Sequence, residues 1–169
     1  MTTIKNYLSS VKRLFETGNA REHSYRGDLQ HLLNEIINDK DIIVTNEPAR
    51  IRDVGAPDYS ITKKEIPIGY IEAKDIDKPL GSKEYKEQFD RYKNALDNLI
   101  ITDYLEFWFY RNGELTHKIN IASIVDGVIV ESEQNFESFY NYIRNFTTYI
   151  SQSIKSPNKL ARLMAGKAR

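Results

Sequence analysis

The stretches Gly55-Ala56-Pro57-Asp58-Tyr59 and Gly69-Tyr70-Ile71-Glu72-Ala73-Lys74 decide how this chain is expected to fold. Two short β-rich runs, residues 58–62 and 67–73, are separated by the polar segment 63–65. Such an arrangement predicts two antiparallel strands joined by a hairpin loop. The start of the first strand and the end of the second then lie at the same end of the sheet.

One carboxylate from each strand and one ammonium group gather at this sheet end. Asp58 begins the first strand, and Glu72 and Lys74 point the same way because alternate side chains of a strand share a face. Two carboxylates can hold Mg²⁺ through oxygen, with waters and substrate phosphate completing the octahedron. The backbone carbonyl of Ala73 is a further candidate ligand. Lys74 can hydrogen-bond the attacking water, and it either makes that water more acidic or stabilises the incoming negative charge.

The triplet Glu-x-Lys by itself is a weak pattern. In a chain with 28% charged residues, such triplets arise by chance, and the alternative is a solvated strand edge with a cross-strand ion pair. The context here is much less common. Pro57-Asp58 opens one strand after a glycine, and Glu72-Ala73-Lys74 closes the next strand at hairpin distance. The combination predicts a metal-dependent site for phosphodiester hydrolysis.

These residues resemble the signature of the PD-(D/E)XK nuclease superfamily. From about residue 20 to the carboxyl end, the chain is also similar to the amino-terminal nuclease domain of single-chain restriction-modification enzymes, including the type ISP class. The further matching stretches are Glu22-His23-Ser24-Tyr25-Arg26, Asn46-Glu47-Pro48-Ala49-Arg50-Ile51, Gln88-Phe89-Asp90-Arg91-Tyr92 and Asn98-Leu99-Ile100-Ile101-Thr102-Asp103-Tyr104. The resemblance implies a three-layer α/β restriction-endonuclease-like fold, with a central mixed sheet flanked by helices. It also implies an endonuclease that cuts double-stranded DNA with Mg²⁺, for which Mn²⁺ can substitute.

The resemblance assigns roles residue by residue. Asp58 and Glu72 match the metal-binding acids, and Lys74 matches the catalytic lysine. Gln88 and Tyr92 match the Gln-x-x-x-Tyr motif that lies on a helix beside the site in RecB-like nucleases. These two accessory positions have ordinary explanations as well. Tyr92 belongs to an apolar stripe at helical spacing, and Gln88 either binds a phosphate or solvates a helix flank.

A third accessory position is acidic. Glu22 matches a residue at the start of the early helix that often completes the metal site in the resembled family. Glu35, later on the same predicted helix, is the alternative, although its apolar neighbours place it beside a core stripe. The sequence therefore leaves two candidates for a third acid.

Hydrophobic periodicity predicts the remaining elements. Helices are expected at about residues 4–15, 25–38, 83–97 and 132–152, and strands at 42–44, 99–102, 104–110 and 114–121. Asn112-Gly113 is a strong signal for a two-residue turn between the last two strands. The aromatic residues of 104–110 are assigned to the core, with a stacking platform for bases as the alternative.

Composition indicates a single globular domain. The 169 residues contain no cysteine and no apolar run of 18 residues, which excludes disulfides, thiolate metal sites and a membrane-spanning helix. No signal-peptide pattern is present, so the cytoplasm is the expected location. With 24 basic and 24 acidic residues, tight DNA binding by this chain alone is not expected. A cluster of Lys83, Lys86, Arg91 and Lys93 on one predicted helix is either a phosphate-binding face or a solvated one.

Residues 1–155 are expected to form the nuclease domain, and 156–169 to begin a basic helical connector to a further region. The resemblance implies a longer parent chain with a methyltransferase, target-recognition and, in type ISP enzymes, helicase-like regions. This sequence contains neither a phosphate-loop motif nor a Pro-Pro dipeptide, so an excised domain or a stand-alone relative is expected. Two other functions remain alternatives: a structure-specific nuclease of the junction-resolvase or repair type, and a non-catalytic domain that binds DNA or a partner.

Overall fold

The structure is a computed structural model that describes residues 2–76 and 78–149. Its centre is a six-stranded sheet in the order β1-β2-β3-β4-β5-β6. Only the central pair β3 and β4 is parallel, and every other neighbouring pair is antiparallel, so the sheet is mixed as predicted. The strands are β1 (Ile42–Asn46), β2 (Tyr59–Lys63), β3 (Ile66–Ala73), β4 (Asn98–Thr102), β5 (Glu106–Arg111) and β6 (Glu114–Asn120).

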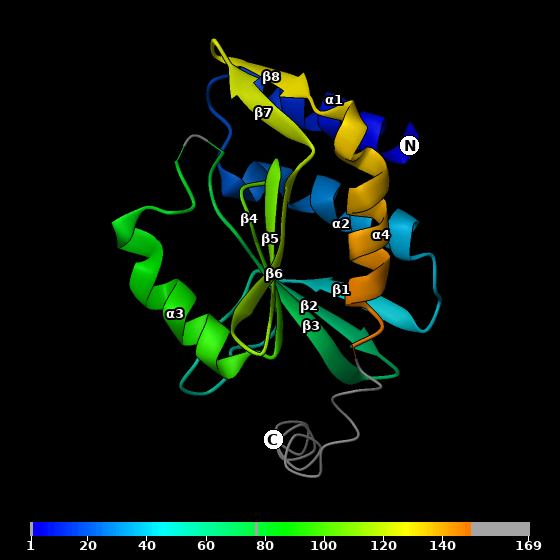
Figure 1. Cartoon of the computed structure of the whole chain (residues 1–169), viewed down its shortest axis with the longest axis vertical. Coiled ribbons are helices and arrows are strands. Elements are labelled where there is room, and N and C mark those ends of the chain that lie inside the picture. Colours follow the sequence, from blue (N-terminus) through cyan, green and yellow to red (C-terminus); the bar gives the residue numbers. More distant parts are fainter. Residues whose placement is uncertain (1, 77, 150–169) are drawn as a thin grey trace.

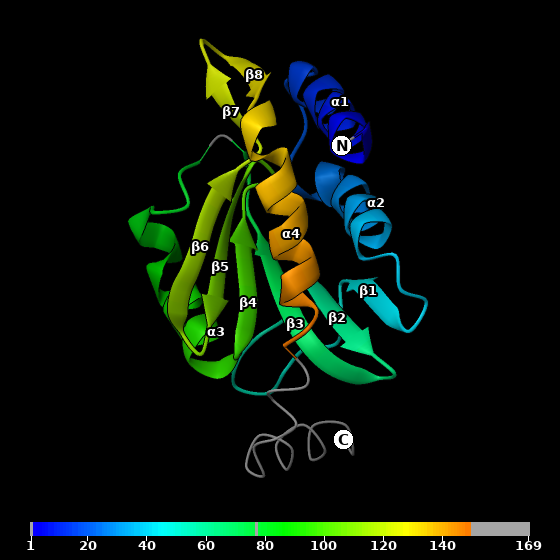
Figure 2. The ribbon, with the colours of Figure 1, turned by 45° about the vertical axis from the view of Figure 1, so that its right-hand side comes forward.

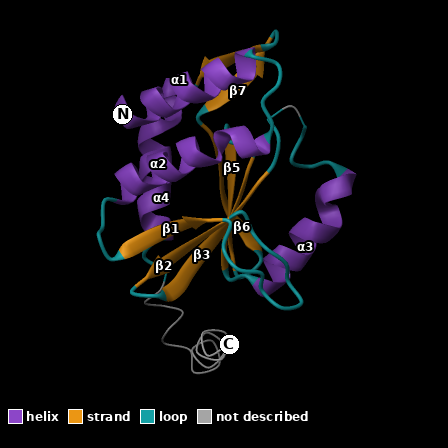
Figure 3. Cartoon of the chain, turned by 180° about the vertical axis from the view of Figure 1, so that it is seen from behind, coloured by secondary structure: helices purple, strands orange, loops and turns teal. Residues whose placement is uncertain are grey.

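Helices cover both faces of this sheet (Figures 1 and 2). One face is covered by α1 (Thr2–Glu16), α2 (Arg26–Ile37) and α4 (Phe136–Phe146). The opposite face carries α3 (Lys86–Ala95), which Figure 3 shows from behind. Short 3₁₀ segments precede three of the helices: η1 (Glu22–Tyr25), η2 (Lys83–Tyr85) and η3 (Glu133–Asn135). The three layers confirm the predicted α/β class.

The two faces of the sheet bury two separate apolar clusters. Strand β5 contributes to both because its side chains alternate: Phe107 and Phe109 pack toward α1, α2 and α4, whereas Trp108 and Tyr110 pack toward α3. Helix α3 adds Phe89, Tyr92 and Leu96 to the second cluster, as its apolar spacing predicts. The aromatic residues of β5 therefore belong to the core.

The hairpin of β2 and β3 has the predicted antiparallel pairing. Its turn is tighter than expected, because Lys64 and Glu65 both adopt positive φ angles, 49° and 70°. Such a two-residue turn matches the right-handed twist of its strands. The register pairs Tyr59 with Ile71. The next residues away from the turn, Asp58 and Glu72, therefore lie opposite each other. Asp58 is thereby set beside the end of β3.

The predicted hairpin at Asn112-Gly113 is present between β5 and β6, whereas a further hairpin after β6 was not predicted. Strands β7 (Ala122–Val125) and β8 (Val128–Glu131) form a two-stranded sheet that lies near α1 in Figure 1. The turn contains Asp126 and Gly127, both at positive φ, and an Asp-Gly pair between two β-branched apolar runs is a recognisable hairpin signal.

This hairpin delays the last helix. The prediction of a helix from 132 to 152 is wrong at its start, because α4 begins at Phe136 after the 3₁₀ turn of η3, and the helix ends at Phe146. Residues 150–152 and the predicted connector 156–169 lie outside the described residues. Among the helices of the described part, none has the length and apolar character needed to cross a membrane.

Candidate functional site

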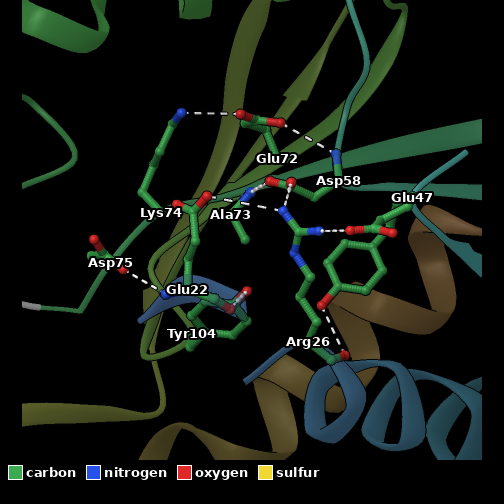
Figure 4. A network of polar contacts seen from close by, with 10 residues as sticks. Glu22, Arg26, Glu47, Asp58, Glu72, Ala73, Lys74, Asp75 and Tyr104 are labelled. Carbon is green, nitrogen blue, oxygen red and sulfur yellow. Dashed lines mark hydrogen bonds and ion pairs between the residues drawn. The ribbon is translucent and has the colours of Figure 1, made fainter. Parts of the chain in front are cut away.

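The two predicted metal-binding acids lie side by side where β2 begins and β3 ends (Figure 4). The Asp58 backbone N–H donates to Glu72 Oε1 at 3.3 Å, and the Ala73 N–H donates to Asp58 Oδ2 at 2.8 Å. Both carboxylates are largely buried, with 12% and 5% of the Asp58 and Glu72 side chains exposed. The fold therefore brings these two acids together as the hairpin predicted.

Lys74 lies on the same side of the strand as Glu72. Its Nζ is 3.1 Å from Glu72 Oε2, and it also lies over the rings of Tyr85 and Phe89, at 5.0 and 5.9 Å from their centroids. The Lys74 N–H donates to the Thr102 carbonyl at 2.9 Å, which holds the backbone against the end of β4. The ammonium group is thus positioned between a carboxylate and two aromatic rings.

Packing two acids this closely has an electrostatic cost. Burial raises the pKa of Glu72, the negative charge of Asp58 raises it further, and the neighbouring Lys74 lowers it without reversing the rise. A carboxylate desolvated beside another carboxylate favours its neutral form unless a cation compensates. The pair is therefore a place where a bound cation would gain binding energy.

Glu22 joins this network, and Glu35 does not. The Glu22 N–H donates to Asp75 Oδ1 at 2.6 Å, and the Tyr104 hydroxyl donates to the Glu22 carbonyl at 2.7 Å. Burial raises the pKa of Glu22, as does the charge of Asp58, which places its carboxyl within electrostatic range of the acid pair. Glu35 is exposed on α2 and pairs with His31 at 2.7 Å instead. Between the two candidates for a third acid, the structure places only Glu22 at the site.

Arg26, to which the sequence analysis gave no role in the site, is also part of the network. Its Nη2 donates to Asp58 Oδ1 at 2.5 Å and lies 3.9 Å from Glu22 Oε1, while Nη1 donates to Glu47 Oε1 at 2.6 Å (Figure 4). Only 11% of the side chain is exposed. The sequence does contain one signal for a buried role of Arg26. This residue precedes the apolar Leu29 by three positions, so it falls on the apolar face of its helix. An arginine in such a position needs an acidic partner.

Of the Gln-x-x-x-Tyr pair of α3, Tyr92 lies beside the loop that leads to Asp58, and Gln88 hydrogen-bonds to Tyr92. Tyr92 is buried, and a Cβ built on Gly55 would lie 3.0 Å from the Tyr92 hydroxyl oxygen. Burial, followed by the charge of Glu72, raises the pKa of Tyr92, and hydrogen bonding by Gln88 lowers it. Tyr92 therefore packs in the core, as its place in the apolar stripe predicted. It also lies beside Gly55, in the loop that leads to Asp58.

The three basic residues of α3 pair with the two acids of the same helix, while Lys83 of the predicted cluster lies in η2. Lys86 and Lys93 both approach Asp90, at 2.7 and 3.3 Å, and Arg91 pairs with Glu87 at 2.5 Å. Ion pairs between neighbouring turns of an exposed helix are ordinary surface features. This arrangement favours the solvated helix face over the phosphate-binding face that the sequence left open.

The chemistry of the donors fits a magnesium ion held in part by substrate. Among the described residues, no three His, Cys, Asp or Glu side chains are arranged as a ready-made metal cage. Mg²⁺ is commonly held by one or two carboxylates, with waters and phosphate oxygens completing its shell. Asp58 and Glu72 supply two such carboxylates, and the pKa of the buried Glu72 stays raised although Lys74 lies beside it. These residues fit the ion that the sequence analysis expected.

Comparisons with known proteins support the fold. No family model matches the sequence, and no curated protein matches it. Among solved structures, the chain is similar to a chain of the cryoEM structure of a DrdV–DNA complex, with a TM-score of 0.58 and 22% identity. The similarity covers 70% of this chain and 12% of that chain. Together with the sheet order and the helix layers, it shows the predicted three-layer restriction-endonuclease-like fold.

Proposed function

We propose that this chain is a metal-dependent endonuclease module that hydrolyses phosphodiester bonds of double-stranded DNA. The observation that carries the proposal is the convergence of Asp58, Glu72 and Lys74 at one end of the sheet, where both carboxylates are buried. The likeness of the fold to a chain that was solved in complex with DNA supports DNA as the substrate.

In the proposed reaction, Asp58 and Glu72 would hold Mg²⁺, with the carbonyl of Ala73 as a further candidate ligand. Bound there, it would supply positive charge to the substrate phosphate and lower the pKa of a bound water. Lys74 donates a hydrogen bond to the attacking water or to a phosphate oxygen, and its ammonium stabilises the negative charge that develops. The water oxygen bonds to phosphorus while one ester P–O bond breaks, which leaves a phosphate monoester and a hydroxyl group.

Three further residues support this arrangement without reacting. Glu22 places an additional carboxylate beside Asp58, Tyr92 packs against the loop that carries Asp58, and Gln88 hydrogen-bonds to Tyr92. We assign them positioning roles. A side chain that fixes the geometry of a site can affect the rate strongly, because small displacements of the reacting groups slow the reaction.

We further propose that the chain acts as part of a longer restriction-modification protein. It spans 12% of the length of the similar chain in the DrdV–DNA complex. Its formal net charge is zero, and the basic residues of α3 are paired with acids, so its own affinity for DNA is expected to be low. Covalently linked target-recognition and methyltransferase regions, and a helicase-like region where one is present, would supply the missing affinity.

Nicking of supercoiled plasmid with Mg²⁺ or Mn²⁺ tests the proposal. Asp58→Asn and Lys74→Met, with folding checked by circular dichroism, should each reduce nicking by on the order of 10²-fold or more. Lys86→Met is a matched control, because this lysine is exposed on the nearby helix, and it should cut like the original chain. If the chain neither cuts DNA nor gains thermal stability from Mn²⁺, the nuclease proposal is wrong.

A further inference from the structure

The guanidinium of Arg26 lies where an ion between three acids would lie. Nη2 is 2.5 Å from Asp58 Oδ1 and 3.9 Å from Glu22 Oε1, and Nη1 is 2.6 Å from Glu47 Oε1 (Figure 4). Metal–oxygen distances for Mg²⁺ are about 2.0–2.1 Å, so an ion bound at Asp58 Oδ1 on this side would overlap Nη2. The guanidinium and such an ion therefore exclude each other.

The two oxygens of Asp58 have different surroundings. Oδ1 accepts from Arg26, whereas Oδ2 accepts the N–H of Ala73, the residue after Glu72 on β3. A carboxylate oxygen has two lone pairs, so Oδ2 can accept this hydrogen bond and still bind a cation. A cation at Asp58 would therefore bind through Oδ2, because the guanidinium of Arg26 occupies the Oδ1 side.

Both the backbone and the side chain of Arg26 are held in place. Its backbone is the first residue of α2, and the Tyr59 hydroxyl donates to its carbonyl at 2.9 Å. The side chain is 11% exposed, and its buried Nε has no hydrogen-bond partner among residues 2–76 and 78–149. The guanidinium therefore keeps its position because carboxylates accept hydrogen bonds from its two terminal nitrogens. Moving it away from them would leave an unpaired charge buried in the protein.

The charges around Arg26 show what the guanidinium compensates. It lies against the carboxylates of Asp58, Glu47 and Glu22. A divalent ion on this side of Asp58 would have to displace that buried guanidinium from its three acidic neighbours.

We propose that Arg26 is a fixed cation that takes the place of a second metal ion, so that the candidate centre binds one divalent ion per chain. The inference rests on the proposed function, because it assumes the Asp58–Glu72 metal site. It assigns Arg26 a positioning role: the guanidinium orients Asp58 through Oδ1 and limits how many ions the acids can hold.

Counting bound Mn²⁺ in the absence of DNA tests this inference, either by calorimetric titration or by electron paramagnetic resonance of the free ion. The original chain and Arg26→Lys should each bind one Mn²⁺. Arg26→Gln removes the fixed charge and should bind two, with a melting temperature that falls without metal and recovers when Mn²⁺ is added. Arg50→Gln removes an exposed arginine of the neighbouring loop and should still bind one ion.

The outcomes separate the inference from the proposed function. Two ions on the original chain would overturn the role of Arg26 and leave the nuclease proposal standing. No ion on the original chain would overturn the inference, and the plasmid assay would then decide the nuclease proposal by itself. If Arg26→Gln folds and still binds one ion, Arg26 is only a structural ion pair and the inference is wrong. Should that variant fail to fold, the counts for the original chain and Arg26→Lys decide, because two ions on either would refute the inference.

Discussion

Replacing Glu72 with glutamine should change how the stability of the metal-free protein depends on pH. Burial and the charge of Asp58 raise the pKa of Glu72 above the ordinary value of 4.5. As the pH rises above 4.5, the unfolded chain loses this proton while the folded protein keeps it. The folded state then binds more protons than the unfolded state, so stability falls with increasing pH until the raised pKa is passed. Glu72→Gln has no proton to lose and should escape this fall.

The magnitude follows from the single proton involved. A difference of one bound proton changes the free energy of unfolding by at most about 1.4 kcal/mol per pH unit. Between pH 5 and pH 7 the variant should therefore gain roughly 2–3 kcal/mol relative to the original chain. For a domain of this size, that difference corresponds to a gain of roughly 5–10 °C in melting temperature. The slope with pH is the decisive quantity.

Thermal melts followed by circular dichroism in EDTA, from pH 5 to pH 8, provide the assay. Glu84→Gln is the matched control, because Glu84 is an exposed glutamate that pairs with Lys78 at 2.6 Å. Its melting curve should shift with pH in parallel with that of the original chain. If the melting temperature of Glu72→Gln also changes with pH in parallel with that of the original chain, Glu72 is not buried beside Asp58 in the way described.

Three further predictions concern residues that support the site. Burial raises the pKa of Asp103 to about 6, so Asp103→Asn should stabilise the protein at pH 8 and have little effect at pH 3.5, as measured by thermal melting. Gly69→Ala should destabilise by about 1–3 kcal/mol, because the added Cβ would lie 2.5 Å from the Phe146 ring. Gly81→Ala, whose Cβ would meet nothing within 4 Å, should change stability far less in the same urea titration. Asn98→Ala removes an amide that donates to two buried carbonyls, at 2.8 and 2.9 Å, and should cost about 1–3 kcal/mol in that titration. Unchanged unfolding midpoints for Gly69→Ala and Asn98→Ala would contradict the packing of α4 on β3.

Local patterns in the sequence were sufficient for most of the architecture. Alternation with a period of two and a polar turn predicted the β2–β3 hairpin, because side chains of a strand reach alternate faces whatever covers them. The same rule placed Glu72 beside Lys74, and the helical spacing of Phe89, Tyr92 and Leu96 predicted the buried face of α3. The β7–β8 hairpin was missed although its Asp126-Gly127 turn carries a local signal.

Composition left the behaviour of charged residues undecided. A cluster of lysines and arginines on one helix can bind phosphate or can pair with acids of the same helix. The predicted helix contains such acids, so the sequence allows either role. In the folded chain, Lys86, Arg91 and Lys93 lie within reach of acids one turn away. Such pairing depends on which rotamers the neighbouring elements leave accessible, and periodicity carries no information about rotamers.

The sequence by itself determined which residues could form an acid pair with a lysine, because the spacing along one hairpin fixes their relative positions. Only the tertiary structure decided between Glu22 and Glu35, and only it gave Arg26 its partners. Glu22 reaches the site because the 3₁₀ turn before α2 docks on Asp75 and Tyr104. These contacts join residues 53 and 82 positions apart. Contacts of that range follow from the packing of whole elements, which no local pattern encodes.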